Sequence, residues 1–159
     1  MIAAVIDTTV LSNFAHVDQP QLLRSAFDDS VTVRAVMDEL AEGVRLARLP
    51  DVNWRWLRVV ELTTDELLRA DELNRTLGRG ESECIALAQS RQWIVLTDDR
   101  DARTAARTAG VSVSGTLGCL MNLIEINTLT LSQADRWLEQ MVRHGYRCPV
   151  KSLADLRRD

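Results

Sequence analysis

The chain has 159 residues, of which 46% are hydrophobic and 26% charged, and its formal net charge is −4. A chain of this length can bury a sizeable core without disulfides or structural metals. No apolar run approaches the ~20 residues of a membrane span, and residues 1–6 are too short for a signal peptide. We therefore expect a soluble cytoplasmic protein with one domain over residues 1–159, which includes the C-terminal helix and tail from about residue 131.

Cysteine and lysine usage exclude several kinds of site. Cys84, Cys119 and Cys148 are odd in number and far apart, so neither a disulfide framework nor a cysteine zinc site is predicted. Lys151 is the only lysine among 19 basic residues, which excludes a P-loop lysine and a Schiff-base lysine. The mild acidity argues against a duplex-DNA binder with a broad basic face, but it leaves room for a local basic groove.

The first half of the chain alternates β-branched runs with segments of helical periodicity. Strands are predicted at residues 2–6, 30–33 and 57–62. Helices are predicted at residues 10–15, from Pro20, at 35–46 and at 65–77, the last capped by Thr63 or Thr64.

The second half follows the same alternation. Residues 78–80 break the chain, and helices are predicted at 81–90, 101–109, 116–126 and 132–144, with strands at 93–96 and 111–113. Strands that alternate with helices at these lengths are typical of a parallel sheet covered on both faces. The sequence therefore predicts an α/β protein with three layers, α/β/α, around a mainly parallel sheet.

Acidic residues follow two of the predicted strands directly. Asp7 follows the first strand, and Asp98 and Asp99 follow the strand at 93–96. Functional sites of such sheets lie beyond the C-terminal ends of the strands. Carboxylates that meet there repel one another unless a cation neutralises them, and Mg²⁺ or Mn²⁺ prefers such oxygen ligands. For Asp7 taken alone, a helix cap remains the alternative.

Three glutamates could join this edge. Glu81 begins its predicted helix and precedes Asp99 by one helix and one strand. Glu83 lies about 200° further around a regular helix, so the two side chains cannot both point inward. Glu39 lies on the helix after the second strand. For Glu39 and Glu83, a solvated helix face is the alternative.

Other chemistry has little support. The chain has no G-x-S-x-G nucleophile elbow, and the glycines at 78 and 80 follow a helix, which is wrong for a dinucleotide site. His16 and His144 are the only histidines, and we expect them on the surface of separate helices.

At this point the sequence resembles PIN-domain proteins, of the kind found as VapC-type toxins. Residues 7–11 resemble the opening D-x-S/T/N-x-L of that family, and residues 39–40 resemble its second acid. Residues 81–99 resemble the acid-led helix, strand and T-x-D that follow. The patterns that begin at Gly80, Asp98 and Gly115, together with the tail at 145–147, resemble a distinct VapC-like subgroup.

The resemblance implies a metal-dependent endoribonuclease that is inhibited by a small antitoxin and forms a homodimer. It implies the catalytic residues Asp7, Glu39, Glu81 and Asp99, with Asp7, Glu81 and Asp99 as ligands of Mg²⁺ or Mn²⁺. The third acid is a departure, because it is Glu81 where most of the family has Asp, and Glu83 competes for the role. An alternative reading is a PIN-fold RNA-binding or interaction module without efficient turnover, and phosphatase activity is a weaker third.

Supporting roles remain open between two readings. The Thr9 hydroxyl either holds Asp7 or a metal-bound water, or it caps a helix. Arg100, Arg103 and Arg107 recur at three- and four-residue spacing on one helix face, which either holds the RNA backbone or faces solvent.

Overall fold

The centre of the protein is a parallel sheet of five strands in the order β3-β2-β1-β4-β5. The computed structural model describes residues 3–157, and at residue 157 it describes the backbone alone. Ile2, which belongs to the first predicted strand, therefore lies outside the described part of the chain. The strands are β1 (Ala4–Ile6), β2 (Ser30–Thr32), β3 (Arg58–Val59), β4 (Ile94–Leu96) and β5 (Val113–Ser114). All four pairings are parallel, which confirms the predicted sheet.

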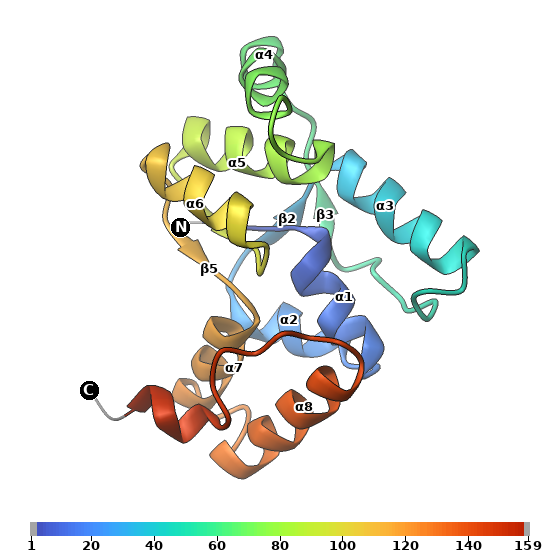
Figure 1. Ribbon diagram of the computed structural model, residues 1–159, viewed down its shortest axis with the longest axis vertical. Coiled ribbons are helices and arrows are strands. Elements are labelled where there is room, and N and C mark those ends of the chain that lie inside the picture. Colours follow the sequence, from blue (N-terminus) through green and yellow to red (C-terminus); the bar gives the residue numbers. More distant parts are fainter. Residues whose placement is uncertain (1–2, 158–159) are drawn as a thin grey trace.

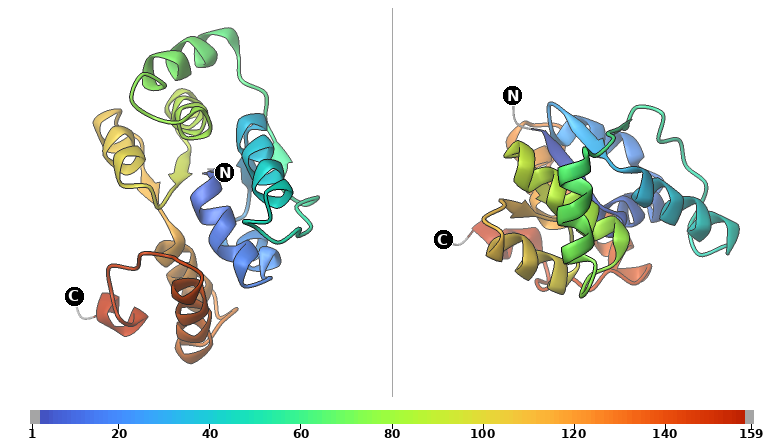
Figure 2. Two further views of the ribbon diagram at one scale, coloured as in Figure 1. Left: turned by 45° about the vertical axis from the view of Figure 1, so that its right-hand side comes forward. Right: turned by 90° about the horizontal axis from the view of Figure 1, so that it is seen from above.

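Helices lie on both sides of the sheet and complete the predicted three-layer architecture. They are α1 (Thr8–His16), α2 (Pro20–Ala26), α3 (Arg34–Arg45), α4 (Thr64–Leu73), α5 (Arg79–Arg91), α6 (Arg100–Thr108), α7 (Thr116–Glu125) and α8 (Leu131–Arg143), followed by the 3-10 helix η1 (Leu153–Arg157). Figures 1 and 2 show the strands between the group α4, α5 and α6 and the group α1, α2, α7 and α8. Within residues 3–157, no helix has the length and apolar character needed to cross a membrane.

The short strands are buried because helices cover both faces. Val5 and Ile6 of β1, Val31 of β2 and Leu96 of β4 have at most 1% of their surface exposed. Such runs without polar alternation are characteristic of strands in parallel sheets. The rigid centre that they form fixes where each strand ends, and therefore where each following helix begins.

Several predicted boundaries differ from the structure. The helix expected over 65–77 ends at Leu73, where Asn74 caps it and the chain turns. The strand expected over 57–62 is only two residues long, because β3 is an edge strand that pairs with β2 alone. The helix expected from residue 81 begins at Arg79, and this places Glu81 at its third position.

Candidate active site

Asp7 is held at the junction between the central strand β1 and helix α1. Its Oδ1 accepts hydrogen bonds from the Thr9 backbone N–H at 2.9 Å and from the Thr9 hydroxyl at 2.6 Å. A longer bond of 3.4 Å comes from the Val10 N–H. Asp7 therefore caps α1, and Thr9 holds Asp7, which is the first of the two readings considered for that hydroxyl.

The other oxygen of Asp7 has no such support. Asp7 is 1% exposed, and Oδ2 is buried without a hydrogen-bond partner of normal geometry. Burial raises the pKa of this carboxyl to about 7, although hydrogen bonding from Thr9 and the nearby Thr97 hydroxyl lowers it. A buried acceptor with so little support from hydrogen-bond donors is costly unless something binds to it. Oxygen Oδ2 is thus the strongest structural indication of a cation site.

Asp99 has the same relation to helix α6 as Asp7 has to α1. Strand β4 ends at Leu96, and Asp99 Oδ1 accepts a hydrogen bond from the Ala102 N–H at 2.8 Å. The acid thus caps α6, as a carboxylate at a helix N-terminus is expected to do. Since β1 and β4 pair in parallel, Asp7 and Asp99 lie at the same edge of the sheet.

Glu81 reaches this edge from helix α5. Its Oε2 accepts a hydrogen bond from the Gly78 N–H at 3.3 Å, which caps α5 from the third position. Burial raises the pKa of Glu81, and the negative charges of Asp99, Glu39 and Asp101 raise it further, in that order of importance. Glu81 therefore lies within the range of the electrostatic fields of Asp99 and Glu39.

Glu39 links two helix N-termini although its side chain is on α3. One oxygen accepts a hydrogen bond from the Thr8 hydroxyl at the start of α1. The other accepts one from the Gly80 N–H at 3.1 Å, at the start of α5. Glu39 is therefore tied into the site and does not belong to a purely solvated helix face.

Gly80 has a specific steric role in this arrangement. A Cβ at position 80 would overlap the Glu39 carboxylate. Because that carboxylate is the end of a flexible side chain, Gly80→Ala should displace it without harming the fold. We expect the melting temperature to stay the same or to rise slightly, since alanine favours helix. Any activity that depends on Glu39 should fall roughly tenfold, about 1.4 kcal/mol of barrier.

The matched control for this substitution is Gly78→Ala. A Cβ at position 78 would meet only Glu81 Oε2, at an ordinary contact distance of 3.8 Å. The two variants are compared by the steady-state rate of that activity and by thermal melts. Equal rates in both would contradict a role for the Glu39–Gly80 contact.

Glu83 lies elsewhere on α5 and has its own partner. It is 7% exposed and forms an ion pair with Arg79, with 3.0 Å between Glu83 Oε1 and Arg79 Nε. This agrees with the expectation that Glu81 and Glu83 do not point the same way. Glu83 is better explained as a stabiliser of the first turns of α5.

Asp98 faces away from the Asp99 cap and toward helix α7. Its Oδ1 accepts from the Thr116 N–H at 2.9 Å, and its Oδ2 accepts from the Thr116 hydroxyl and from Asn13 Nδ2, the latter at 3.0 Å. The Asp98 N–H donates to the Thr9 hydroxyl at 2.9 Å. Both carboxylate oxygens are thus occupied, and Asp98 positions α1 and α7 relative to β4.

Replacing Asp98 by alanine should therefore destabilise the protein. The change removes the acceptor of the Thr116 N–H and one of the two acceptors of the Asn13 amide in a partly buried position. We expect the free energy of unfolding to fall by roughly 2–4 kcal/mol, measured by urea denaturation. Asp51→Ala, at an exposed aspartate, should change it by less than about 0.5 kcal/mol. A loss at Asp98 no larger than this control would contradict the positioning role.

The three arginines of α6 are not equivalent. Arg103 Nη1 donates to the Thr97 carbonyl oxygen at 2.9 Å and so supports the end of β4. Arg100 and Arg107 are exposed. All three line one groove next to Asp98, so they share a face as predicted.

Sequence reasoning missed two contacts around the site. Asn13 of α1 bonds to Asp98 across 85 positions of sequence, and no local pattern indicates that contact. His16 and His144 stack with their ring centroids 5.2 Å apart, which joins the end of α1 to the end of α8. The Thr116 contact had a signal, because the glycine before it lets Asp98 approach the start of α7 closely.

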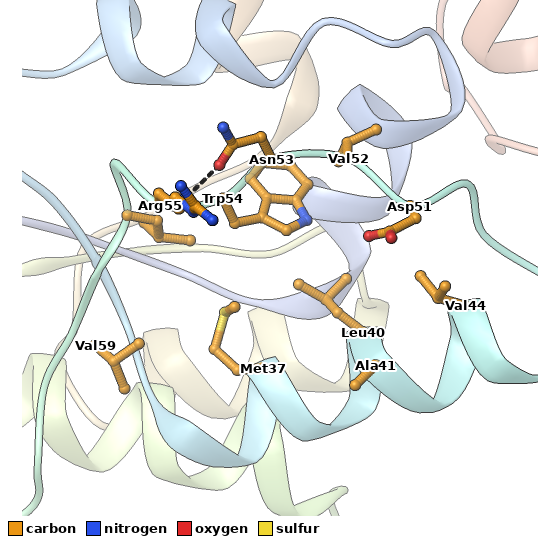
Figure 3. Close-up of a pocket in the computed structure, with 11 residues that line it drawn as sticks. Met37, Leu40, Ala41, Val44, Asp51, Val52, Asn53, Trp54, Arg55 and Val59 are labelled. Atoms are coloured by element: carbon orange, nitrogen blue, oxygen red, sulfur yellow. Dashed lines mark hydrogen bonds between the residues drawn. The ribbon is translucent and has the colours of Figure 1, made fainter.

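A cavity of about 940 Å³ lies apart from the acids, between α3 and the segment 51–59. Figure 3 shows Trp54, Met37 and Leu40 around it, and none of the predicted site acids lines it. Trp54 and Trp56 are partly buried against the core, with ring centroids 6.0 Å apart. Packing therefore accounts for these two tryptophans, and the cavity is not part of the candidate active site.

One feature is common to Asp7, Glu81 and Asp99. Each uses one carboxylate oxygen to cap the helix that starts at this edge. The second oxygen of each makes no hydrogen bond of normal geometry to another described residue. The capping bonds fix three carboxylates at one edge and leave one oxygen of each able to bind a ligand.

This donor set suits a divalent cation of the Mg²⁺ type. Among residues 3–157, no group of three His, Cys, Asp or Glu side chains is close enough together to hold a metal ion without rearrangement. Mg²⁺ commonly keeps several waters and takes only one or two carboxylates, so such convergence is not required. The buried Asp7 Oδ2 favours a bound cation, and so do the burial and the neighbouring negative charges that raise the pKa of Glu81. The residues present therefore fit the cation.

Comparison with known proteins agrees with this arrangement. A family model described as a PIN domain matches residues 3–159 of the chain. The match includes all of the acids described above. No curated protein matches the chain.

Proposed function

The chain belongs to the PIN-domain family, and on that premise we propose that it is a Mg²⁺- or Mn²⁺-dependent endoribonuclease. PIN domains are usually nucleases and generally use divalent metals, which supports a hydrolase at the level of reaction class. The observation that carries the proposal is the set of three helix-capping acids, Asp7, Glu81 and Asp99, each with one oxygen outside its capping bond. In Asp7 that oxygen, Oδ2, is buried without a hydrogen-bond partner of normal geometry. We further propose the VapC-like role of a toxin, with a small antitoxin as partner and a homodimeric assembly.

In the proposed mechanism Asp7, Glu81 and Asp99 would hold the cation through the oxygens that do not cap a helix. When bound, the cation would supply a more acidic water and offset negative charge on the phosphate. The Thr9 hydroxyl fixes Asp7 by its bond to Oδ1, so Oδ2 stays directed away from the cap. Glu39, held by Thr8 and Gly80, is placed to orient a water beside Glu81.

Metal binding is tested by calorimetry with Mg²⁺ and Mn²⁺. We expect the wild type to bind and Asp7→Asn and Asp99→Asn to bind at least tenfold more weakly, a change of about 1.4 kcal/mol or more for one lost anionic ligand. Asp51→Asn is a suitable control, because Asp51 is exposed and outside the site. Equal affinity in all four proteins would contradict the proposed ligands.

The reaction itself is tested on a panel of single-stranded RNAs with Mg²⁺ and then with EDTA. We expect cleavage with Mg²⁺ and none with EDTA, and no phosphate release from a monoester, since the chain has no phosphatase nucleophile pattern. Cleavage that persists in EDTA, or rapid monoester hydrolysis, would refute the proposal. RNA binding without cleavage would instead indicate a binding module.

A further inference from the structure

A groove of about 510 Å³ opens between helix α6 and the segment that follows α8. This return segment, residues 144–152, crosses back from α8 toward η1, as Figure 1 shows in red-orange. Arg100, Arg103 and Arg107 of α6 line the groove, and Tyr146 and Arg147 of the return segment line it as well. Asp98, the sequence neighbour of Asp99, is also in its lining, whereas Asp7, Glu39, Glu81 and Asp99 are not. The groove therefore begins next to the candidate active site and leads away from it along α6.

The charge of the groove is strongly positive in a chain whose net charge is −4. Four arginines line it, and within residues 3–157 none of the four forms an ion pair with a carboxylate. The one acid in the lining, Asp98, already accepts hydrogen bonds from Thr116 and Asn13. The charge of Arg103 interacts with that of Asp98, so one carboxylate offsets part of the charge of four guanidinium groups. The remaining positive charge favours binding of an anion, and the planar donors of arginine match phosphate oxygens.

Apolar side chains complete the lining. Leu117, Tyr146 and Pro149 lie among the arginines, and Tyr146 is half-buried against the core. An aromatic ring beside charged donors suits a nucleotide, because the base can stack while the phosphate binds arginine. A base can stack on a side chain only when it is not paired inside a duplex, and this favours a single strand over a helix.

We propose that this groove binds the part of a single-stranded RNA that extends from the candidate active site along α6, with Arg107 and Arg147 on phosphates and Tyr146 against a base. The inference rests on the proposed nuclease function and names where its substrate lies. It also assigns a role to the return segment: this segment supplies one side of the substrate groove, and α6 supplies the other.

Direct binding tests the groove without turnover. A fluorescein-labelled single-stranded RNA of about 12 nucleotides, within the size range of such sites, is titrated in EDTA and followed by anisotropy at several salt concentrations. The double variant Arg107→Gln/Arg147→Gln avoids Arg103, which supports the Thr97 carbonyl. Arg24→Gln is the matched control, because Arg24 is exposed on α2 and outside the groove.

We expect the double variant to bind RNA roughly tenfold more weakly at 50 mM salt and to lower the slope of log K against log salt by about 1.4, or 0.7 for each phosphate contact. The Arg24 variant should match the wild type. Tyr146→Leu keeps an apolar side chain but removes the ring, so it should weaken binding several-fold with an unchanged salt slope.

Unchanged affinity and salt slope in the double variant would overturn the inference. Displacement of the labelled RNA by polyglutamate as effectively as by unlabelled RNA would also overturn it, because it would indicate a site for acidic peptides. If the wild type cleaves RNA while the double variant binds normally, the groove assignment fails and the nuclease proposal stands. If RNA binds through the groove but is never cleaved with metal, the nuclease proposal fails and the groove assignment stands.

Discussion

Replacing Asp7 by asparagine is expected to abolish cleavage and, at the same time, to stabilise the metal-free protein at pH 8. The loss of one free anionic oxygen should reduce the rate roughly 1,000-fold, equivalent to about 4 kcal/mol of barrier. The gain in stability follows from burial, which raises the pKa of the Asp7 carboxyl to about 7 in the folded state. Asparagine keeps an acceptor for the cap of α1 but carries no charge.

The direction of the pH dependence follows from that raised pKa. Between the ordinary value of 3.8 and about 7, the folded protein keeps the Asp7 proton while the unfolded chain loses it. This group therefore lowers stability as the pH rises through that window, and the loss levels off above pH 7. The variant should gain on the order of 3 kcal/mol over the wild type at pH 8 and little at pH 4.

Thermal and urea unfolding at several pH values in EDTA measure this difference. Added Mg²⁺ should narrow it, because a ligand that binds only the folded wild type stabilises that protein alone. Asp51→Asn serves as a control at an exposed position. A variant that is less stable than the wild type at pH 8 in EDTA would mean that the Asp7 charge is already compensated within the chain.

The second large effect is a difference in cleavage rate between variants of the two glutamates of helix α5. Glu81→Gln should reduce cleavage by roughly 30- to 1,000-fold, or about 2–4 kcal/mol of barrier, because Glu81 lies with Asp99 and Glu39. Glu83→Gln should retain a measurable fraction of the activity, since Glu83 pairs with Arg79. Both rates are measured at saturating Mg²⁺ on the same RNA.

Unfolding experiments show whether these effects are chemical. Burial and the neighbouring acids raise the pKa of Glu81, so removing its charge should leave the stability unchanged or increase it. Glu83→Gln should cost at most about 1 kcal/mol, because its partner Arg79 is largely exposed. An inactive Glu83 variant beside an active Glu81 variant would show that the assignment within this helix is wrong.

The sequence by itself determined the elements and the acids at their ends. Strand runs and helical periodicity predicted the parallel α/β sheet, and the positions of Asp7 and Asp99 directly after strands placed both at one edge. The spacing from Glu81 to Asp99 predicted that the two acids can reach the same edge, and in the structure the charge of Asp99 acts on Glu81. These inferences succeeded because periodicity, caps and strand ends depend on neighbours within a few residues of sequence. The family match confirms the PIN-domain resemblance, whereas the VapC-like subgroup remains a prediction.

Only the tertiary structure decided which distant groups support those acids. Glu39 meets Gly80 across 41 positions and Asn13 meets Asp98 across 85, while the return segment brings Arg147 to the groove beside α6. Such contacts depend on how whole helices pack around the sheet, and no local spacing encodes that packing.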